Sequence, residues 1–373
     1  MNVRAIYKNY FFVQITLGLL FFWSFSGCNT PSLTEPEPNT DLTQPWPTAT
    51  PAEVGIDENR LSQAVAKAEK IPSFLSLLVV KDGSLALESY FHRNQAESLN
   101  DVRSVTKSIV STLVGIALKE GFIGSLDETL GDHLELEVFE LDSVQKSISI
   151  RHLLTMTSGF QWDEWESDSY STWIQSIDHI LHVLQQPIIN TPGAQFTYNS
   201  GAVHLLGALL QEAVGMPLPE FADRYLFSKI GISKRSWEAL SNEFVNGGAG
   251  IDLRPRDLAR LGQFYLQKGI SNGEQILPVD WSEEATAPRF EWRFDFGALQ
   301  NYTYGYLWWV HEGPETAFFA WGYGGQFIYV VPRLNLVVVT TTNWSGFRSD
   351  NDRLALVSEA LDIIINDVLK AAQ

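Results

Sequence analysis

The order of strand-like and helix-like segments along the chain predicts a mixed fold with strands near both ends. Two apolar, β-rich runs, Phe74–Val80 and Leu85–Phe91, flank Lys81-Asp82-Gly83-Ser84, a pattern typical of a β-hairpin. Through the middle of the chain, apolar residues recur at helical spacing. The segments expected to be helical are Ala52–Lys70, Val105–Glu120, Ile150–Met156, Trp173–Gln185, Ala202–Val214 and Pro255–Gln267.

The C-terminal part returns to strands and then ends in an amphipathic helix. Short turns between the late strands indicate antiparallel pairing. We therefore expect an α+β fold, in which an antiparallel sheet from both chain ends is flanked by the terminal helices. A mainly helical subdomain, roughly residues 125–250, is inserted between the two groups of strands. The expected late elements are strands at Thr303–His311, Ala317–Trp321, Gln326–Val331 and Leu334–Thr341, and a helix from about Asn351 to Leu369.

Residues 1–28 have the layout of an export signal. Two cations, Arg4 and Lys8, precede an apolar run that ends in Phe25-Ser26-Gly27-Cys28. This ending resembles a bacterial lipobox, in which the Cys is diacylated, although Phe25 stands where Leu is usual. We expect a lipoprotein signal peptide and a protein that is exported to the bacterial cell envelope and lipid-anchored there through Cys28. An uncleaved membrane anchor and a plain secretory peptide are the alternatives.

The next segment, residues 29–50, is rich in Pro, Thr, Asn and Glu, and this composition predicts a disordered tether. Residues 51–373 then form the predicted catalytic body. The chain has a formal charge of −18, which repels phosphate backbones, so we expect no nucleic-acid partner. Cys28 is the single cysteine, which excludes an internal disulfide.

Ser104 and Lys107 lie three residues apart at the start of a predicted buried helix, so their side chains share one face. The helix N-terminus adds partial positive charge and free backbone N–H groups. Burial favours the neutral amine of Lys107, which can then take the hydroxyl proton of Ser104. The N–H of Ser104 can face a developing oxyanion. The alternative for this common motif is a helix cap followed by a surface lysine.

Together with four later blocks, this motif resembles the serine β-lactamase and penicillin-binding superfamily. The likeness runs from about Ala52 to the C-terminus and is greatest for the class C-like branch, which includes family VIII carboxylesterases and 6-aminohexanoate-dimer hydrolases. The resemblance implies a β-lactamase/transpeptidase-like fold and an acyl-enzyme on Ser104. The blocks, in the family's order, are Ser104-Val105-Thr106-Lys107-Ser108, Leu153-Leu154-Thr155-Met156-Thr157-Ser158-Gly159, Tyr198-Asn199-Ser200-Gly201, Asp257-Leu258-Ala259-Arg260 and Gly322-Tyr323-Gly324-Gly325-Gln326.

Tyr198-Asn199-Ser200 stands where class C-like members carry Tyr-x-Asn or Tyr-x-Ser. The resemblance implies that Tyr198 lies near Ser104 and Lys107. An adjacent ammonium would lower the pKa of the phenol, so we expect Tyr198 and Lys107 to share the base role. Tyr198 would also protonate the leaving group, and Ser200 would help by hydrogen bonding. A tyrosine packed in a turn is the alternative.

The late strand departs from the family pattern. The family has Lys-Thr-Gly or a variant there, and its lysine helps bind the carboxylate of a β-lactam or peptide end. This chain has Ala320-Trp321-Gly322 instead. Likeness to family esterases implies that Trp321 and Gly322 contact an ester or amide without that carboxylate. By the same analogy, the N–H of Tyr323 is the second oxyanion donor.

The leading hypothesis is therefore a serine esterase or amidase that acts on small acyl substrates and uses no metal or other cofactor. A peptidoglycan-directed D,D-peptidase or D-amino-acid amidase, and then a β-lactamase, are the alternatives. Each would need a cation from elsewhere, such as Arg254, Arg256 or Arg333. A non-catalytic binding module is disfavoured by the intact catalytic motifs.

Four acidic residues lie among aromatic residues between the two catalytic motifs. We interpret this stretch as a polar loop over core aromatics, and a lid or pocket wall that selects the substrate is the alternative. The four are Asp163, Glu164, Glu166 and Asp168.

Overall fold

The computed structural model describes residues 39–134, 139–164, 168–240, 244–292, 295–347 and 349–373. Cys28 and the first part of the predicted tether, residues 29–38, lie outside these ranges. From Asn39 to Gln373 the chain forms one compact unit.

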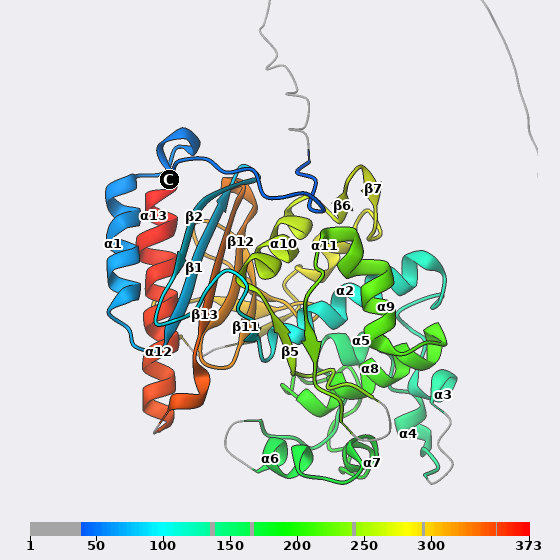
Figure 1. Cartoon of the computed structure of the whole chain (residues 1–373). Helices are drawn as coiled ribbons and strands as arrows, with labels where there is room; N and C mark the ends of the chain where they lie inside the picture. Colours follow the sequence, from blue (N-terminus) through cyan, green and yellow to red (C-terminus); the bar gives the residue numbers. More distant parts are fainter. Residues whose placement is uncertain (1–38, 135–138, 165–167, 241–243, 293–294, 348) are drawn as a thin grey trace, which may run out of the picture. The chain divides into compact units, whose positions relative to one another are not determined.

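An eight-stranded antiparallel sheet is the centre of this unit (Figure 1). Its strand order is β2-β1-β13-β12-β11-β10-β9-β8. The first hairpin thus pairs with the last strand, and Leu77 lies opposite Thr340. This confirms the predicted sheet from both chain ends. The strands are β1 (Phe74–Lys81), β2 (Ser84–Tyr90), β8 (Phe290–Trp292), β9 (Tyr302–Tyr304), β10 (Trp309–His311), β11 (Ala317–Gly322), β12 (Gln326–Val331) and β13 (Leu336–Thr342).

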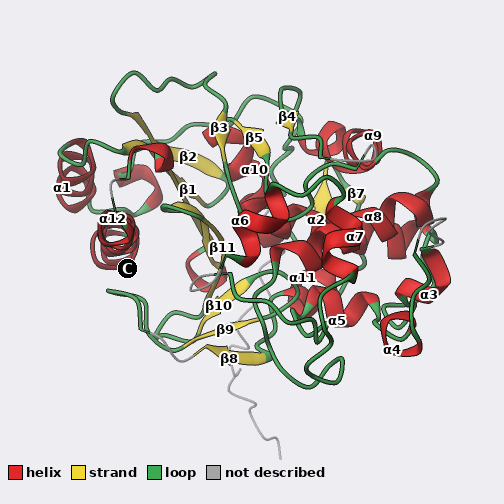
Figure 2. Cartoon of the chain, turned by 90° about the horizontal axis from the view of Figure 1, so that it is seen from below, coloured by secondary structure: helices red, strands yellow, loops and turns green. Residues whose placement is uncertain are grey.

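Helices cover both faces of the sheet (Figures 1 and 2). One face carries α1 (Glu58–Glu69) and the C-terminal helices α12 (Asp350–Asp362) and α13 (Leu369–Ala371), which a π-helical turn joins. The other face carries α2 (Val105–Glu120) and α10 (Pro255–Leu266). Every residue of β13 is buried, as expected for a strand covered on both sides.

The middle of the chain is mainly helical, as predicted. Its largest helix, α8, is buried along most of its length. The predicted helix Trp173–Gln185 is two helices, because the carboxylate of Asp178 caps a new helix by accepting from the Leu181 N–H at 2.9 Å. The helices are α3 (Leu130–His133), α4 (Ser143–Lys146), α5 (Ile150–Leu154), α6 (Ser169–Ile174), α7 (His179–Leu184), α8 (Ser200–Val214), α9 (Leu218–Ala222) and α11 (Trp281–Ala285).

Short strands connect this helical part to the main sheet. One small sheet has the order β3-β5-β4, and β6 and β7 form a separate pair. These strands are β3 (Asn100–Asp101), β4 (Ser236–Trp237), β5 (Ile251–Leu253), β6 (Ile270–Ser271) and β7 (Glu274–Gln275). Within the described ranges, no single helix is both long and apolar enough to cross a membrane; α8 and the segment Leu218–Ile230 meet those limits only as a pair bent by 76°.

Residues 39–50 differ from the predicted tether because they lie against the body. Leu42 is 1% exposed, and its carbonyl accepts a hydrogen bond from Arg260 Nε at 3.0 Å. The carbonyl of Pro47 accepts from the N–H of Leu85 at 2.8 Å. Leu85 belongs to β2, an edge strand of the sheet. This segment therefore supplies backbone hydrogen-bond partners that an edge strand otherwise lacks.

The predicted strand Thr303–His311 is a tight hairpin. Tyr304 of β9 lies opposite Trp309 of β10, and Leu307 between them has a left-handed backbone with φ of 58°. The continuous aromatic and apolar run hides this turn, because both strands and the turn are buried. The hairpin brings several aromatic side chains to one end of the sheet.

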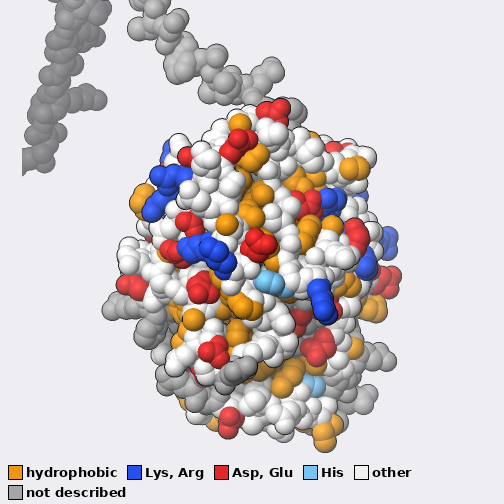
Figure 3. All heavy atoms as spheres, turned by 60° about the vertical axis from the view of Figure 1, so that its left-hand side comes forward, with side chains coloured by type: hydrophobic (Ala, Val, Ile, Leu, Met, Phe, Trp, Pro, Cys, Tyr) orange, Lys and Arg blue, Asp and Glu red, His pale blue; other side chains and the backbone are white. Residues whose placement is uncertain are grey.

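The outer surface carries both signs of charge. On the side of the molecule where α1 lies, acidic and basic side chains are interspersed among apolar ones (Figure 3). The negative net charge is therefore not gathered into a single acidic area on this face.

Candidate active site

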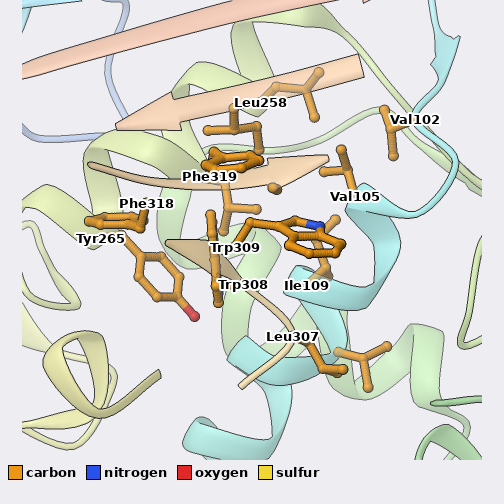
Figure 4. Packing of buried hydrophobic residues seen from close by; sticks show 14 of the residues in the cluster. Val102, Val105, Ile109, Leu258, Tyr265, Leu307, Trp308, Trp309, Phe318 and Phe319 are labelled. Carbon is orange, nitrogen blue, oxygen red and sulfur yellow. The ribbon is translucent and has the colours of Figure 1, made fainter. Parts of the chain in front are cut away.

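Ser104 lies at the N-terminal end of α2, directly after a strained turn. Arg103 has a left-handed backbone with φ of 50°, and the carboxylate of Asp101 accepts from the Arg103 N–H at 2.9 Å. The first turns of α2 are fixed by packing: Val105 and Ile109 lie beside Trp309 in the buried cluster (Figure 4). The hydroxyl of Ser104 is thus held on rigid backbone at the wall of a cavity.

Lys107 is buried directly behind Ser104. The side chain is 1% exposed, and Nζ lies 2.9 Å from Ser104 Oγ, 2.8 Å from Ser200 Oγ and 2.6 Å from the Gly248 carbonyl. Burial lowers the pKa of Lys107 to about 7, although the carboxylate of Glu164 opposes this shift. A neutral amine is therefore well populated near neutral pH, one hydrogen bond from the hydroxyl of Ser104.

Tyr198 lies beside the same two groups. Its ring centroid is 5.0 Å from Lys107 Nζ, and the ring stacks on Trp309 at 5.9 Å. Burial raises the pKa of Tyr198, and the negative charge of Glu164 adds to this, while the hydrogen bond with Ser104 opposes it. The sequence-based expectation of a lowered phenol pKa was wrong, because it neglected burial. Tyr198 therefore suits the role of a proton donor better than that of a base.

Ser200 begins α8 and connects Lys107 to a carboxylate. The side chain of Asn199 caps α8 by accepting from the Ala202 N–H at 2.8 Å, which fixes Ser200 in the first turn. Ser200 Oγ accepts from Lys107 and donates to Glu164 in a short hydrogen bond. Glu164 also accepts from the Ser200 N–H at 3.1 Å.

Glu164 is a site residue to which the sequence analysis assigned no catalytic role. Its second carboxylate oxygen accepts from Trp162 Nε1 at 2.6 Å, and the residue lines the cavity. It belongs to the acidic stretch for which a pocket wall was the alternative interpretation. The only sequence signal was an acid among aromatics, since no spacing rule links it to Ser200.

The late strand passes against the segment that precedes Ser104. A methyl group on Gly322 would lie 2.2 Å from the Val102 carbonyl, so only glycine allows this approach. The neighbours Trp321 and Tyr323 line the cavity, as does Ser104. Ala320 is fully buried on the other side of the strand.

The cavity has a volume of about 660 Å³ and combines an aromatic wall with three charged side chains. The charged residues are Arg103, Arg353 and Glu164. Arg353 and Arg103 each lie over an aromatic ring, at 5.0 Å from the centroid of Tyr323 and 4.4 Å from that of Trp344. The aromatic lining residues are Tyr170, Tyr198, Phe296, Tyr302, Trp309, Trp321, Tyr323 and Trp344.

The arginines named from the sequence as possible replacements for the missing lysine lie elsewhere. Arg254 pairs with Asp257 at 2.7 Å, and Arg256 pairs with Glu88 at 2.5 Å. Arg333 pairs with Glu315. The structure instead brings Arg103 and Arg353 to the cavity, which the sequence analysis missed because neither follows a motif of the late strand.

The structure thus brings most of the predicted site residues together. Ser104, Lys107, Tyr198 and Ser200 form one contact network, with Trp321 and Tyr323 in the adjoining wall and Gly322 behind them. Cys28 lies outside the described residues.

Comparisons with known proteins agree with this arrangement. A family model described as Beta-lactamase matches residues 61–362. The chain is 24% identical over 347 residues to the 6-aminohexanoate-dimer hydrolase of Paenarthrobacter ureafaciens, a match that covers 85% of this chain and 86% of that protein.

Solved structures share the fold. A Bacillus anthracis protein provisionally described as a 6-aminohexanoate-dimer hydrolase has a TM-score of 0.70 and 20% identity, with 90% of this chain and 89% of that chain covered. A Beta-lactamase/D-alanine Carboxypeptidase from Yersinia pestis has a TM-score of 0.65 and 15% identity, with 85% and 99% covered.

Proposed function

Since the chain belongs to the beta-lactamase family, we propose that it is a serine hydrolase that cleaves ester or amide bonds of small acyl substrates through an acyl-enzyme on Ser104. The observation that carries this proposal is the contact of 2.9 Å between Lys107 Nζ and Ser104 Oγ. The amine is desolvated, so a neutral base is available near pH 7. A buried base within hydrogen-bond distance of a helix-terminal serine is the geometry that nucleophilic catalysis requires, because the hydroxyl can then donate to the neutral amine.

In the proposed reaction, Ser104 Oγ attacks the carbonyl carbon and gives its proton to Lys107 Nζ. The carbonyl oxygen becomes an oxyanion, which the N–H groups of Ser104 and Tyr323 stabilise. When the tetrahedral intermediate collapses, the bond to the leaving group breaks and Tyr198 donates a proton to that group. Lys107 then returns its proton to Tyr198. Water repeats the sequence on the acyl-enzyme and releases the acid.

A fluorophosphonate probe tests the nucleophile. We expect stoichiometric labelling on Ser104, identified by mass spectrometry of the peptide, and no labelling or ester hydrolysis by Ser104→Ala. Ser111→Ala is the matched control, because Ser111 is buried on the same helix and is not among the residues that line the cavity. An adduct on another serine would contradict the proposal.

The substrate class follows from the cavity. Its wall is mainly aromatic, which favours an apolar acyl or alcohol group. Ala320 and Trp321 stand where family members that bind β-lactams carry a cation, so we propose esters or amides without the β-lactam carboxylate as substrates. Arg103 and Arg353 favour a second candidate, a peptidase or β-lactamase that acts on anionic substrates.

Two substrates separate these candidates. A charge-assisted hydrogen bond to a carboxylate contributes about 1.5–3 kcal/mol, so its loss lowers kcat/KM about tenfold to a hundredfold. We therefore expect short-chain p-nitrophenyl esters to be hydrolysed much faster than nitrocefin. Nitrocefin hydrolysis that matches the best ester, and that falls in Arg353→Gln, would favour the second candidate.

We also propose that the protein is exported and lipid-anchored through Cys28, on the strength of the lipobox-like sequence. Metabolic labelling with palmitate should mark the wild-type protein and should be lost in Cys28→Ser. Unchanged labelling and membrane partition of that variant would indicate a different anchor.

A further inference from the structure

Glu164 is held in one orientation although its loop lines the cavity. One carboxylate oxygen accepts from Ser200 Oγ, and the other accepts from the Ser200 N–H at 3.1 Å and from Trp162 Nε1 at 2.6 Å. Three donors thus point at a single carboxylate. A carboxylate fixed in this way cannot reorient to bind a substrate. We therefore expect Glu164 to act on catalysis through the residues to which it is hydrogen-bonded.

The partner that matters is Ser200, because it contacts both Glu164 and Lys107. Lys107 Nζ donates to Ser200 Oγ at 2.8 Å, and the hydroxyl hydrogen of Ser200 is directed to Glu164. The three groups form a continuous chain with one direction of donation. When Lys107 takes the proton of Ser104, the new ammonium is therefore connected to a negative charge through one hydroxyl.

We propose that Glu164 is a positioning residue that stabilises the protonated form of Lys107 through Ser200 and so sets the pH at which Ser104 becomes nucleophilic. This inference rests on the proposed serine-hydrolase function. The carboxylate holds the ammonium during the lifetime of the tetrahedral intermediate. The cost is that Lys107 becomes neutral only at a higher pH than burial alone would give.

Other charged and titratable groups surround the hydrogen-bonded series of Lys107, Ser200 and Glu164. They act on the same equilibrium, which is the protonation of Lys107. Arg103, at the start of α2, disfavours the ammonium of Lys107, whereas Glu164 favours it. The phenols of Tyr198, Tyr170 and Tyr304 face Glu164, and burial raises the pKa of all three, so they remain neutral near pH 7. Glu164 thus supplies a negative charge that favours the ammonium of Lys107.

The test measures the rate constant for fluorophosphonate labelling of Ser104 between about pH 5 and pH 9. The wild-type rate should rise with pH as Lys107 loses its proton. In Glu164→Gln the midpoint of this rise should move to lower pH by about half a unit or more, because the charge that favours the ammonium is gone. A purely structural role would lower the rate at every pH and leave the midpoint in place.

Further variants make the result specific. Glu164→Asp keeps the charge, so its midpoint should return to within about 0.2 units of the wild type. Asp168→Asn is the matched control, since it removes an exposed carboxylate four residues away without touching Ser200, and its midpoint should not move. If Glu164→Gln does not fold, as judged by circular dichroism, Glu164→Ala removes the carboxylate without placing an amide NH₂ against the donors of Ser200 and Trp162.

The outcomes distinguish this inference from the function on which it rests. Labelling of Ser104 in the wild type, with a coincident midpoint in folded Glu164→Gln or Glu164→Ala, would overturn the role of Glu164 and leave the serine hydrolase standing. A midpoint that moves equally in Asp168→Asn would show a general charge effect and would also overturn it. Failure of the wild type to label on Ser104 would overturn both.

Discussion

Lys107 shows how burial converts a strongly basic side chain into a base that works near neutral pH. The amine has three hydrogen-bond acceptors, so the site does not expel the ammonium completely, yet desolvation brings the pKa to about 7. A catalytic base is most effective when its pKa lies near the working pH. The same desolvation makes the protonated side chain unfavourable for folding.

The pH dependence of ester hydrolysis should report this amine. Because the neutral form is the active one, kcat/KM should fall as the pH drops below about 7, where the pKa of Lys107 lies. Lys107→Arg, which stays protonated, should lose about three orders of magnitude or more in kcat/KM at pH 7. A flat profile from pH 5 to pH 8 would show that Lys107 is not the titrating base.

The same residue should make stability depend on pH in a defined direction. The pKa of Lys107 is near 7 in the folded chain and near 10.5 in the unfolded chain. Between these values the unfolded chain binds more protons, so the free energy of unfolding should rise with pH across this window. Lys107→Met should flatten this part of the curve in urea titrations, and an unchanged slope would contradict the assignment.

At the scale of single residues, local rules predicted the Ser104–Lys107 pair because both lie on one helical turn. Tyr198 and Ser200 were placed only by resemblance, since nothing local joins them to α2. Neither local rules nor the resemblance identified Glu164, because its partner Ser200 is distant in sequence and its loop has no regular spacing. The pKa of Tyr198 was predicted in the wrong direction for a similar reason: the depth of burial is a property of the whole fold.

Among the elements, the contact between β11 and the start of α2 controls the site. Gly322→Ala should force the strand away from the Val102 carbonyl, because the added methyl group would lie 2.2 Å from that oxygen. We expect a loss of about 1–3 kcal/mol in unfolding free energy and a fall in kcat/KM of at least about tenfold. Gly346→Ala, where a methyl group meets nothing within 4 Å, is the control and should behave as the wild type in thermal unfolding and turnover.

The bounds of elements with a strong hydrophobic periodicity were predicted closely. The bounds of elements that a turn or a capping side chain interrupts were not. The helix Val105–Glu120 has the predicted bounds, since its apolar character continues to the glycine that ends it. The segment 303–311 was predicted as one strand and is a hairpin. Its turn could not be told from a strand because strand and turn are equally apolar when both are buried. A single capping carboxylate, that of Asp178, divided the helix predicted from Trp173 to Gln185.

For the molecule as a whole, the pattern of strands at both ends and helices between them was sufficient to predict the architecture. Composition alone misassigned residues 39–50, because a proline-rich segment can still satisfy an exposed strand edge through its backbone. Hydrogen bonds of this kind leave no mark on hydropathy. Leu42 and Trp46 are the large apolar residues of this segment, and both pack against the body.

This anchoring makes a prediction about stability. Leu42→Ala should lower the free energy of unfolding by about 2–4 kcal/mol, because the side chain is buried against the body. Val279→Ala is the control, since Val279 is 66% exposed, and should change it by less than about 0.5 kcal/mol. Equal urea midpoints for the two variants would show that residues 39–50 contribute nothing to the fold.

The pairing of β1 with β13 also constrains how the chain reaches its native state. β1 and β13 lie near opposite ends of the body and must pair to form the middle of the sheet. The chain therefore has to bear the entropic cost of closing a very long loop before most of the sheet can form. Folding should therefore be slow, and the helical middle is free to form early while the strand edges still lack partners. A chain that lacks its last forty residues would keep every residue of the catalytic network and still have no partner for its first hairpin. Such a fragment should aggregate, which makes completion of the C-terminus the step that determines the yield of native protein.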